Sequence, residues 1–345
     1  MIRFLTIEST CDETAAAVIT ENLDVLGSAL ASQDHLHEHY RGVVPEIAAR
    51  AHVERILPVI DQALTKAQLT LDDLDAIAVA TQPGLANSLL VGLMAAKSIS
   101  LACGIPLIEI NHLHAHIFAC RMAAKREVFP CVGLIISGGH SHLFRYESAL
   151  DATLLGGTID DAAGEAFDKV ASMLGLGYPG GPALSKAAET GNAKAYRFPR
   201  SFIKDKRLDF SFSGLKTAVR YAITGNGKVD LSQIQLSAQS IADIAASFEL
   251  AVSETIAIKS VHALQQTGLK RLCVGGGVAA NRCVRAELDA AAKDNSFELI
   301  IAPPHLCTDN AVMGAIAIEK YRAGLFAPLN IDITPGLIRT ANRVR

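Results

Sequence analysis

Short apolar runs separated by polar or glycine-rich turns open the chain. Residues 3–33 (RFLTIESTCDETAAAVITENLDVLGSALASQ) contain three such runs, each with the length and composition of a strand. Residues 131–161 (CVGLIISGGHSHLFRYESALDATLLGGTIDD) repeat the arrangement. Each stretch therefore predicts a meander of three strands joined by tight turns.

Helical patterns and further strands follow both meanders. The predicted helices cover residues 44–67, 163–174, 181–190 and 237–266, and the predicted strands cover 76–80 and 271–274. One plan is thus used twice, about 130 residues apart, although coincidence is the alternative because many α/β proteins begin with a hairpin. A duplicated meander with crossover helices predicts a two-lobed α/β protein with a cleft between the lobes.

The composition is that of a protein with substantial cores. The chain has 345 residues, of which 50% are hydrophobic, enough for about two domains. It contains no run of about 18 apolar residues, and its start, MIRFLTIEST, has no signal-peptide pattern. The seven cysteines form no CxxC pair, which favours reduced thiols. We therefore expect a cytoplasmic protein without a membrane segment.

The charge balance limits how the chain could bind nucleic acid. A net charge of −3 gives no global basic field, so a local patch or a partner must supply the attraction. Tryptophan is absent and aromatics are 5% of the chain, which argues against a base-stacking surface. Residues 191–229 interleave Lys and Arg with Phe and Tyr. This segment is either a solvated loop or a basic contact surface for an anionic partner.

Three histidines are grouped in NHLHAHIFAC, residues 111–120. A predicted strand over 105–110 precedes them, and helical sequence capped by Asn111 follows. On that helix His112 and His116 lie one turn apart on one face, a spacing that suits a transition-metal ion. The alternative is that they bind backbone or water. A zincin peptidase would need Glu directly after the first histidine, where this chain has Leu113.

A third metal ligand must come from elsewhere in the chain. Asp309, before a helix of small residues, is either a helix cap or a ligand. His305 and Cys307 are competing candidates nearby. A second group of three histidines alternates along the sequence: His35, His37 and His39. They could share one face of a strand as a metal site, although a solvated loop is the simpler interpretation.

Four glycine-rich turns lie at predicted strand ends, at residues 137–141, 155–157, 177–182 and 274–281. Glycines at such junctions let backbone N–H groups approach a phosphate, which predicts nucleotide binding, whereas tight-turn geometry is the alternative for each turn. No Walker A or GxGxxG sequence is present. Acidic residues accompany the turns and could serve metal-bound water or ribose: Asp12, Glu13, Asp160, Asp161, Glu165 and Asp168. Glu165 and Lys169 could equally form an exposed i,i+4 pair.

Long motifs in this order resemble the TsaD family, the tRNA N6-adenosine threonylcarbamoyltransferases once described as O-sialoglycoprotein endopeptidases. They are ESTCDETAAAV, GVVPEIAARAH, NHLHAH, ISGGHS, IDDAAGEAFDKVASMLGLGYPGGP, DFSFSGLKTAV, VGGGVAAN and CTDNAVMGA. The resemblance implies the duplicated actin/hexokinase/Hsp70-like (ASKHA) fold, a two-lobe α/β fold with a central cleft. We expect a first lobe over 1–128 and a second over 129–345, with a basic insertion at about 191–229 and a C-terminal segment that could return to the first lobe.

The resemblance also implies an activity and its ligands. Family members transfer the threonylcarbamoyl group of threonylcarbamoyl-adenylate to N6 of adenosine 37 in tRNAs reading ANN codons, forming N6-threonylcarbamoyladenosine (t6A). One divalent ion per subunit, iron or zinc, is implied on His112, His116 and Asp309. The matching substrate and nucleotide contacts, where ATP, ADP or AMP could also bind, are Ile135, Ile136, Ser137, Gly138, Gly139, Asp168, Gly181 and Asn281. Asp12 and Glu13 match the acidic turn after the first strand.

The chain departs from the family pattern at a few positions. His114 and Ala115 stand where Glu and Gly are usual, Arg41 replaces a Gly, and Asn87 replaces another. His114 could add a ligand or alter metal preference. None of these changes removes one of the expected ligands.

Chemistry suggests how the groups would act. The adenine amine is a poor nucleophile, so the two reactants must be aligned and the growing negative charge stabilised. An ion on three side chains keeps an open position and acts as a Lewis acid. Asp12 is a candidate general base by position only. The candidate tRNA contacts are Lys204, Lys206, Arg207 and Lys216.

Two other functions remain as alternatives. A metallopeptidase is disfavoured by Leu113, and a non-catalytic nucleotide-dependent scaffold is disfavoured by the complete ligand trio. Bacterial relatives work with a paralogue, TsaB, and a small ATPase, TsaE, whereas organellar relatives form self-dimers. The expected partners are therefore tRNA and either a TsaB-like paralogue with a TsaE-like ATPase or a second copy of the chain.

Overall fold

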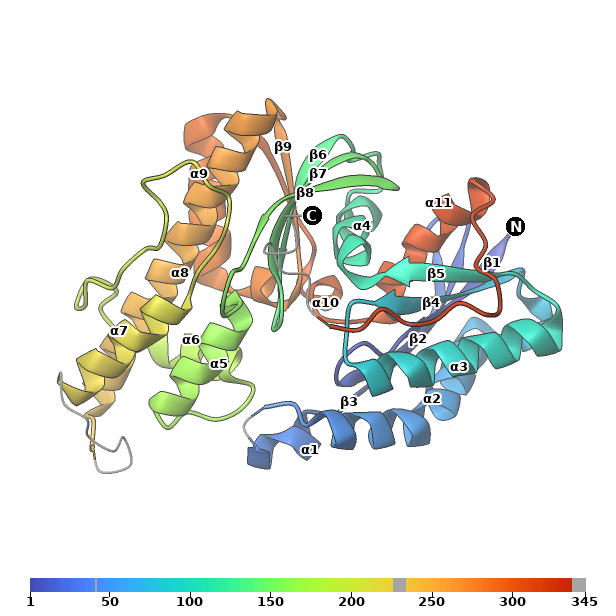
Figure 1. Cartoon of the computed structure of the whole chain (residues 1–345), viewed down its shortest axis with the longest axis horizontal. Coiled ribbons are helices and arrows are strands. Elements are labelled where there is room, and N and C mark those ends of the chain that lie inside the picture. The colour runs from blue at the N-terminus through green and yellow to red at the C-terminus, as the bar shows by residue number, and fades with distance from the viewer. Residues whose placement is uncertain (41, 226–233, 337–345) are drawn as a thin grey trace. The chain divides into compact units, whose positions relative to one another are not determined.

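The structure is a computed structural model that describes residues 1–40, 42–225 and 234–336 (Figure 1). Arg41, residues 226–229 of the basic segment and the last residues of the chain lie outside the described part. The described chain forms two compact units. Unit 1 contains Met1–Glu127, Ser148–Asp151 and the described residues of Thr308–Leu337, and unit 2 contains Val128–Glu147 and Ala152–Cys307.

Unit 1 is built on a five-stranded sheet with the order β3-β2-β1-β4-β5. The strands are β1 (Arg3–Glu8), β2 (Glu13–Thr20), β3 (Val25–Ser32), β4 (Ala76–Gln82) and β5 (Leu107–Asn111). β1 pairs antiparallel with β2 and parallel with β4, and β4 pairs parallel with β5. Central strands buried on both faces need nearly continuous apolar sequence, which is what FLTIE and AIAVA supply.

Unit 2 repeats this design. Its sheet has the order β10-β9-β6-β7-β8, from β6 (Cys131–Ile136), β7 (Ser141–Ser148), β8 (Asp151–Gly157), β9 (Arg271–Gly275) and β10 (Glu298–Ile301). β6 pairs antiparallel with β7 and parallel with β9. Numbered from its own first strand, each sheet reads 3-2-1-4-5. The predicted duplication is therefore confirmed.

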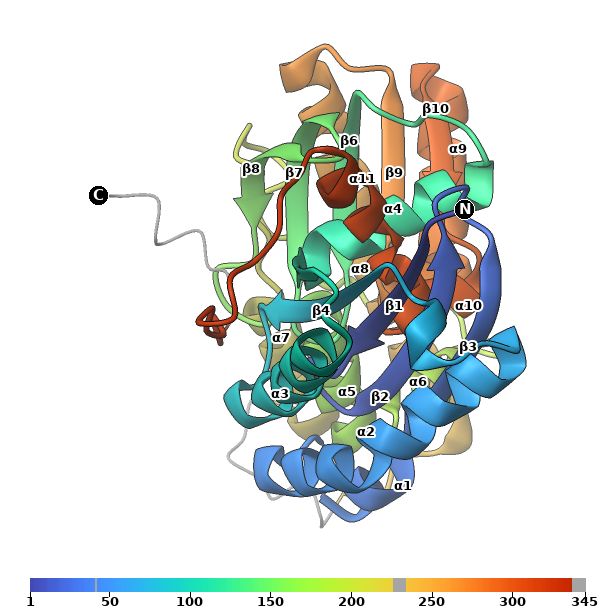
Figure 2. The ribbon, with the colours of Figure 1, turned by 90° about the vertical axis from the view of Figure 1, so that its right-hand side faces the viewer.

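Two long helices pack on the sheet of unit 1 (Figure 2). They are α2 (Pro45–Ala67), which begins with proline in its first turn, and α3 (Ala86–Cys103). The core between these layers includes Leu5, Ile7, Val18, Ile56, Ile60, Ile77, Val79 and Leu93. The remaining α-helices in the described part of unit 1 are α1 (Asp34–His37), α4 (His112–Ala124) and α11 (Ala317–Arg322), with the 3-10 helices η1 (Glu38–Tyr40), η2 (Leu71–Asp73) and η5 (Ala311–Ile316).

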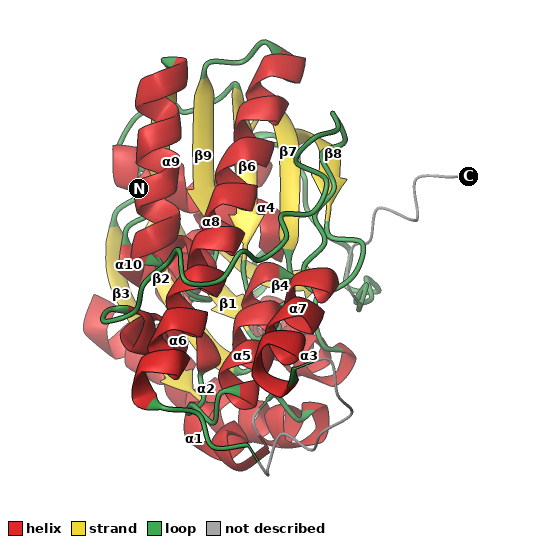
Figure 3. Ribbon diagram, turned by 90° about the vertical axis from the view of Figure 1, so that its left-hand side faces the viewer, coloured by secondary structure: helices red, strands yellow, loops and turns green. Residues whose placement is uncertain are grey.

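Unit 2 is dominated by α8 (Ala238–Thr267), which packs on β6 and β9 and beside α9 (Arg282–Asn295) (Figure 3). The other helices are α5 (Ala163–Met173), α6 (Gly180–Ala188), α7 (Ser213–Thr224), α10 (Pro304–Cys307) and the 3-10 helix η4 (Gly277–Ala280). The predicted helices and strands are confirmed to within a few residues at their ends.

One local prediction is wrong. His35, His37 and His39 do not share a strand face, because residues 34–37 form α1 and residues 38–40 a 3-10 turn. His37 is buried with Nε2 3.3 Å from Gln33 Oε1, while His35 and His39 are exposed. The alternating histidines therefore point in different directions and form no common metal site.

Among the described residues one helix, α3, has the length and apolar composition of a membrane span, with 33% of it buried. Core helices of soluble proteins share these properties. Here α3 packs against β4 and α2 of its own unit, so a core helix fits the observation.

Candidate functional site

The start of α4 brings two histidines onto one buried face. Asn111, the last residue of β5, caps the helix by accepting the backbone N–H groups of Leu113 at 2.9 Å and His114 at 3.4 Å. The rings of His112 and His116 follow one turn apart, with centroids 4.7 Å from each other. The predicted cap is confirmed, and the i,i+4 spacing places both rings side by side.

Asp309 completes a group of three possible ligands. Its Oδ1 lies 3.5 Å from His112 Nε2 and 3.2 Å from His116 Nε2. The neighbouring Asn310, not Asp309, caps η5 by accepting the Met313 N–H at 3.2 Å. The cap alternative for Asp309 is therefore wrong, and its carboxylate is directed at the histidines.

Close packing of η5 on β1 carries Asp309 to this position. Thr6 Oγ1 donates a hydrogen bond to the Ala311 carbonyl at 2.7 Å. A Cβ added at Gly314 would lie 2.9 Å from Thr6 Cβ, so only glycine permits this approach. A segment about 200 residues after α4 is thereby held against the first strand of the unit.

The three side chains fit a tetrahedral metal ion. Ligand atoms at about 2.0–2.1 Å from such an ion lie about 3.3–3.4 Å from one another. The two separations from Asp309 Oδ1, 3.2 and 3.5 Å, match this value. His116 is fully buried: its Nε2 lies 3.2 Å from the Asp309 carboxylate, and among the described residues its Nδ1 has no hydrogen-bond partner. Because a buried imidazole normally needs a partner, a cation accounts for this arrangement better than packing alone.

A second carboxylate lies behind His112. His112 Nδ1 lies 3.2 Å from Glu8 Oε2 and 3.3 Å from Thr10 Oγ1, and Glu8 Oε1 accepts the Thr10 N–H at 2.8 Å. Burial opposes charge on His112, but the carboxylates of Asp309 and Glu8 outweigh it and raise the pKa of His112 to about 9. A carboxylate on the far nitrogen orients a metal-binding imidazole. The role of Glu8 was not predicted from the sequence. The one local indication was a carboxylate at the end of an apolar strand.

His114 and the other candidates do not join this group. Burial, followed by the charge of Lys320, lowers the pKa of His114 to about 4, and His114 is not among the grouped ligands. Cys307 Sγ is 3.1 Å from the Ala302 carbonyl, and His305 is exposed. Among the described residues the three predicted ligands are thus the ones that unit 1 brings together.

The turn after β1 forms a second acidic cluster. Carboxylate oxygens of Asp12, Glu13 and Asp34 all lie within 4.8 Å of one another. Burial raises the pKa of Asp12, and burial followed by the charges of Asp309 and Asp12 raises the pKa of Glu13 well above its usual value. The turn is held by His52 of α2, whose Nε2 lies 3.0 Å from the Cys11 carbonyl.

In unit 2, the glycine turn after β6 is packed against the start of α5. The N–H groups of Gly164 and Glu165 donate to the carbonyls of Ser137 at 3.2 Å and Gly138 at 3.0 Å. A Cβ at Gly164 would meet Gly138 Cα at 2.7 Å, which explains the glycine. Gly138 is exposed and Gly139 is half-buried.

The remaining predicted nucleotide contacts have structural partners of their own. The side chains of Ile135 and Ile136 are fully buried in β6, so a ligand could reach only their backbone. Asp168 accepts the Gly180 N–H at 2.8 Å, beside the open position of Gly181. Asn281 caps α9 by accepting the Val284 N–H at 2.9 Å.

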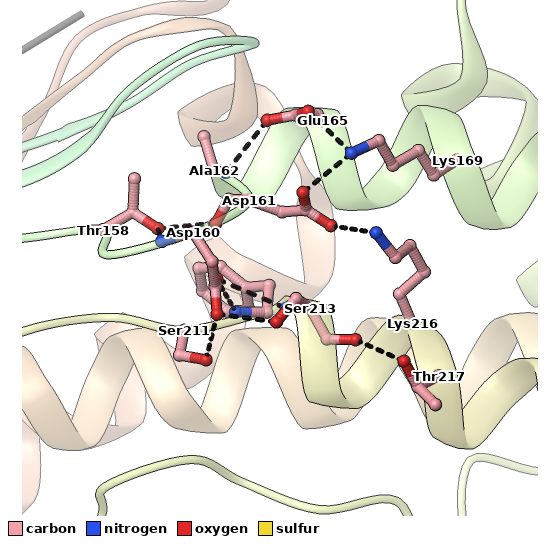
Figure 4. Close-up of polar contacts among 11 residues, drawn as sticks. Thr158, Asp160, Asp161, Ala162, Glu165, Lys169, Ser211, Ser213, Lys216 and Thr217 are labelled. Atoms are coloured by element: carbon pink, nitrogen blue, oxygen red, sulfur yellow. Dashed lines mark hydrogen bonds and ion pairs between the residues drawn. The ribbon is translucent and has the colours of Figure 1, made fainter. Parts of the chain in front are cut away.

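Two adjacent acids, Asp160 and Asp161, anchor α7 (Figure 4). Asp160 accepts four hydrogen bonds from three consecutive residues: the hydroxyl and backbone groups of Ser211, Phe212 and Ser213. Asp161 pairs with Lys169 and with Lys216, each at 2.7 Å. Burial opposes ionisation of both acids, but these donors outweigh it and lower their pKa values. The expected Glu165–Lys169 pair is also present at 2.7 Å.

The predicted basic surface divides into exposed and paired groups. The exposed side chains are Lys204, Lys206 and Arg207, of which Arg207 also pairs with Asp205 at 2.9 Å. Lys216 is instead paired with Asp161, and the loop is held from beneath by the buried Lys259, which donates to the Phe202 and Arg207 carbonyls.

Comparison with known proteins gives one consistent family. The sequence matches the family described as "TsaD: tRNA N6-adenosine threonylcarbamoyltransferase" over residues 24–316. A protein of that name from Rhodopirellula baltica is 58% identical, covering 97% of each chain. Another from Trichlorobacter lovleyi is 46% identical, covering 96% of this chain and 95% of the relative.

Solved structures show the same fold at low identity. HypF of T. kodakarensis aligns with a TM-score of 0.62 at 16% identity, covering 94% of this chain and 48% of HypF. Component A of the Acidaminococcus fermentans (R)-2-hydroxyglutaryl-CoA dehydratase aligns with a TM-score of 0.52 at 15% identity, covering 94% of this chain and 100% of that chain. With the two 3-2-1-4-5 sheets, these matches identify the ASKHA fold.

Proposed function

The chain belongs to the TsaD family, tRNA N6-adenosine threonylcarbamoyltransferase, and we propose that it works with a divalent ion on His112, His116 and Asp309. It transfers the threonylcarbamoyl group of threonylcarbamoyl-adenylate to N6 of adenosine 37 in tRNAs reading ANN codons, forming t6A. The observation that supports the ion is the ligand geometry of unit 1, with buried nitrogens at tetrahedral separations from one carboxylate.

The donor set suits Fe²⁺ or Zn²⁺, because imidazole and carboxylate ligands are typical of both. When bound, such an ion supplies Lewis-acid polarisation of a carbonyl or phosphoryl oxygen. The protein's part is to hold three ligands rigidly and to leave a position open. Glu8 fixes the ring of His112, and the packing of η5 on β1 fixes Asp309.

Asp12 is the proposed general base for the N6 amine. The amine loses a proton as the new C–N bond forms, and a carboxylate with a raised pKa is a better acceptor than an ordinary one. Burial of Asp12 supplies that raised pKa. Asp12→Asn is expected to lower kcat while binding of the adenylate is retained.

Unit 2 supplies the proposed nucleotide contacts. Ser137, Gly138 and Gly139 offer a turn where a phosphate can approach backbone closely. The other proposed contacts are the backbone of Ile135 and Ile136, with Asp168, Gly181 and Asn281. AMP, the leaving group, and also ATP or ADP are expected to bind these residues in the isolated protein.

The basic surface is the proposed contact for tRNA phosphates. Lys204, Lys206 and Arg207 are exposed, and removing a side chain that neutralises a phosphate reduces the salt dependence of binding. Neutralising all three should lower the slope of log Kd against log salt by about 2–3. Lys293→Gln, at an exposed position on α9, is the control. An unchanged slope in the triple variant would remove this surface from the tRNA site.

We further propose a TsaB-like paralogue as protein partner, with a TsaE-like ATPase joining in bacteria, or a self-dimer in the organellar manner. The outer faces of α2 and α3 expose large apolar side chains: Val53, Leu57, Leu90, Met94 and Leu101. Such a face is costly to leave in water. Leu57→Glu should abolish co-elution with the paralogue and leave a monomer, whereas the exposed Leu325→Glu should not. A cytoplasmic location fits these partners.

Reconstitution tests the function directly. Purified protein is given threonine, bicarbonate, ATP, the adenylate-forming enzyme, the partner proteins and tRNA, and the nucleosides are analysed for t6A. Wild type should form t6A and His112→Ala should not. Peptidase activity that survives purification and requires His112 would support the metallopeptidase alternative instead.

A further inference from the structure

A carboxylate of α8 joins two other helices of unit 2. Glu249 Oε1 accepts hydrogen bonds from Ser185 Oγ on α6 and from Asn281 Nδ2 at the start of α9, both at 2.6 Å. Asn281 Nδ2 also lies 2.9 Å from Ser185 Oγ. The three side chains therefore form a closed triangle with the carboxylate as shared acceptor.

Both ends of the Asn281 amide are fixed by this arrangement. Its Oδ1 accepts the Val284 N–H at 2.9 Å and caps α9, while its Nδ2 is committed to Glu249 and Ser185. The amide can satisfy all of these contacts in one orientation only. Loss of the carboxylate would free Nδ2 and let the side chain rotate away from that orientation.

The same triangle also holds α6 at its second turn. Ser185 lies on the helix that begins at Gly180, where the backbone N–H is held by Asp168 at 2.8 Å. The helix is thus fixed at its start by Asp168 and, through Ser185, farther along by Glu249. Gly181, Asn281 and Asp168 are three of the proposed nucleotide contacts.

Charge compensation does not explain Glu249. Among the described residues it has no ion pair with Lys or Arg, and the groups that donate to its carboxylate are a hydroxyl and an amide. The neighbouring residues of α8 are apolar and buried, including Phe248, Ala251 and Val252. A partly buried acid held by neutral donors costs desolvation, which favours a role in orientation.

We propose that Glu249 is a positioning residue for the nucleotide site, holding the Asn281 amide and, through Ser185, helix α6 in the orientation that binds the adenylate. This inference rests on the proposed assignment of Asn281 and Gly181. Glu249 itself need not touch the nucleotide.

The test compares Glu249→Ala with Glu249→Gln, using AMP as the probe in calorimetry. Glu249→Ala should weaken AMP binding at least about tenfold, as loss of an orienting partner typically does. Glu249→Gln should remain within about threefold of wild type, because its carbonyl can accept both hydrogen bonds. In turnover, KM for the adenylate should rise in Glu249→Ala with a smaller change in kcat. Glu254→Gln, on the same helix but paired with Arg200 at 2.7 Å, is the matched control.

Unchanged AMP binding by folded Glu249→Ala would overturn the proposal, as would equal losses in the Gln and Ala variants. If Glu249→Ala does not fold, Ser185→Ala removes one corner of the triangle, with the hydrogen bonds to Glu249 and Asn281, and should weaken AMP binding about threefold to tenfold. An unchanged affinity there also overturns it. Asn281→Ala distinguishes failure of the positioning role of Glu249 from failure of the nucleotide site. If Asn281→Ala also leaves AMP binding intact, the proposed nucleotide site itself is wrong.

Discussion

The two units share one sheet order but surround their acidic residues in opposite ways. In unit 1, Asp309 lies beside His112 and His116, while Asp12 and Glu13 cluster with Asp34. In unit 2, Asp160 has four hydrogen-bond donors and Asp161 has two lysines. Burial raises the pKa of Asp12, whereas donors lower the pKa of Asp160.

This difference separates sites that need a ligand from sites that are complete. A concentration of buried carboxylates beside imidazoles is suited to holding a cation, because the cation offsets the repulsion and desolvation of the carboxylates. Acids with full sets of donors stabilise the fold and need nothing further. The same 3-2-1-4-5 framework thus carries the proposed metal centre in one copy and a set of fully hydrogen-bonded acids in the other.

The largest expected effect comes from removing a ligand in unit 1. His116→Ala deletes one of three donors from the proposed ion, and we expect metal content to fall to background and t6A formation to be lost. Metal is measured by mass spectrometry after dialysis against buffered Zn²⁺ or Fe²⁺.

His114→Ala is the matched control on the same helix. His114 lies outside the ligand group, so metal content should stay near one ion per subunit. If His114→Ala loses the metal as completely as His116→Ala does, the three-ligand assignment is wrong and the atypical histidine is a ligand.

The next largest effect is expected at Asp160, which anchors α7 in unit 2. Asp160→Ala leaves the donors of Ser211, Phe212 and Ser213 without their acceptor, which should lower the free energy of unfolding by about 2–4 kcal/mol. Urea unfolding of metal-free protein measures this. Glu165→Ala breaks a half-exposed pair with Lys169 and a long contact to the Ala162 N–H at 3.4 Å, and should cost about 1 kcal/mol or less. Equal losses of unfolding free energy in Asp160→Ala and Glu165→Ala would contradict the distinction between an acid with a full set of donors and an acid in an exposed pair.

Glu8 offers a finer test of the metal centre. Glu8→Ala removes the carboxylate from His112 Nδ1 and should weaken metal affinity by about tenfold to a hundredfold. Glu8→Gln keeps a hydrogen-bonding group and should recover most of that loss. Competition with a chromophoric chelator gives both affinities, and the visible spectrum of the Co²⁺ form reports whether the ligand geometry is retained. A spectrum and affinity unchanged in Glu8→Ala would show that Thr10 alone orients the ring.

Sequence patterns predicted the fold because strand and helix periodicities here are local. The meanders at 3–33 and 131–161, the cap at Asn111 and the one-turn spacing of His112 and His116 all depend on neighbouring residues. The choice between coincidence and duplication required the strand order, which the sequence alone does not contain.

Contacts between distant segments could not be predicted in the same way. Glu8 and His112 are 104 positions apart, and no local pattern joins them. Asp309 could be assigned only through the family resemblance, since its alternative as a helix cap was equally consistent with the sequence. The alternating histidines at 35–39 suggested a strand face where the structure has a helix, because a one-turn helix is too short to show its own periodicity.

The smallest expected effect is a pH dependence of opposite sign in the two units. Asp12 has a raised pKa, so its ionised form costs stability at neutral pH, and Asp12→Asn should raise the Tm of metal-free protein by about 2 °C. That advantage should already shrink as pH falls through the raised pKa of Asp12, which lies above the ordinary value of 3.8.

Asp160 has a lowered pKa, so its contribution to stability is fully present above 3.8 and is lost only as pH falls below that value. Asp160→Asn should therefore lower the Tm at pH 7, and its deficit should persist to lower pH than the gain of Asp12→Asn. Thermal unfolding of both variants and wild type between about pH 7 and 3 gives the two curves. Deficits of the same sign in both variants at pH 7 would mean that Asp12 is compensated as fully as Asp160, and the contrast between the units would then not lie in their acids.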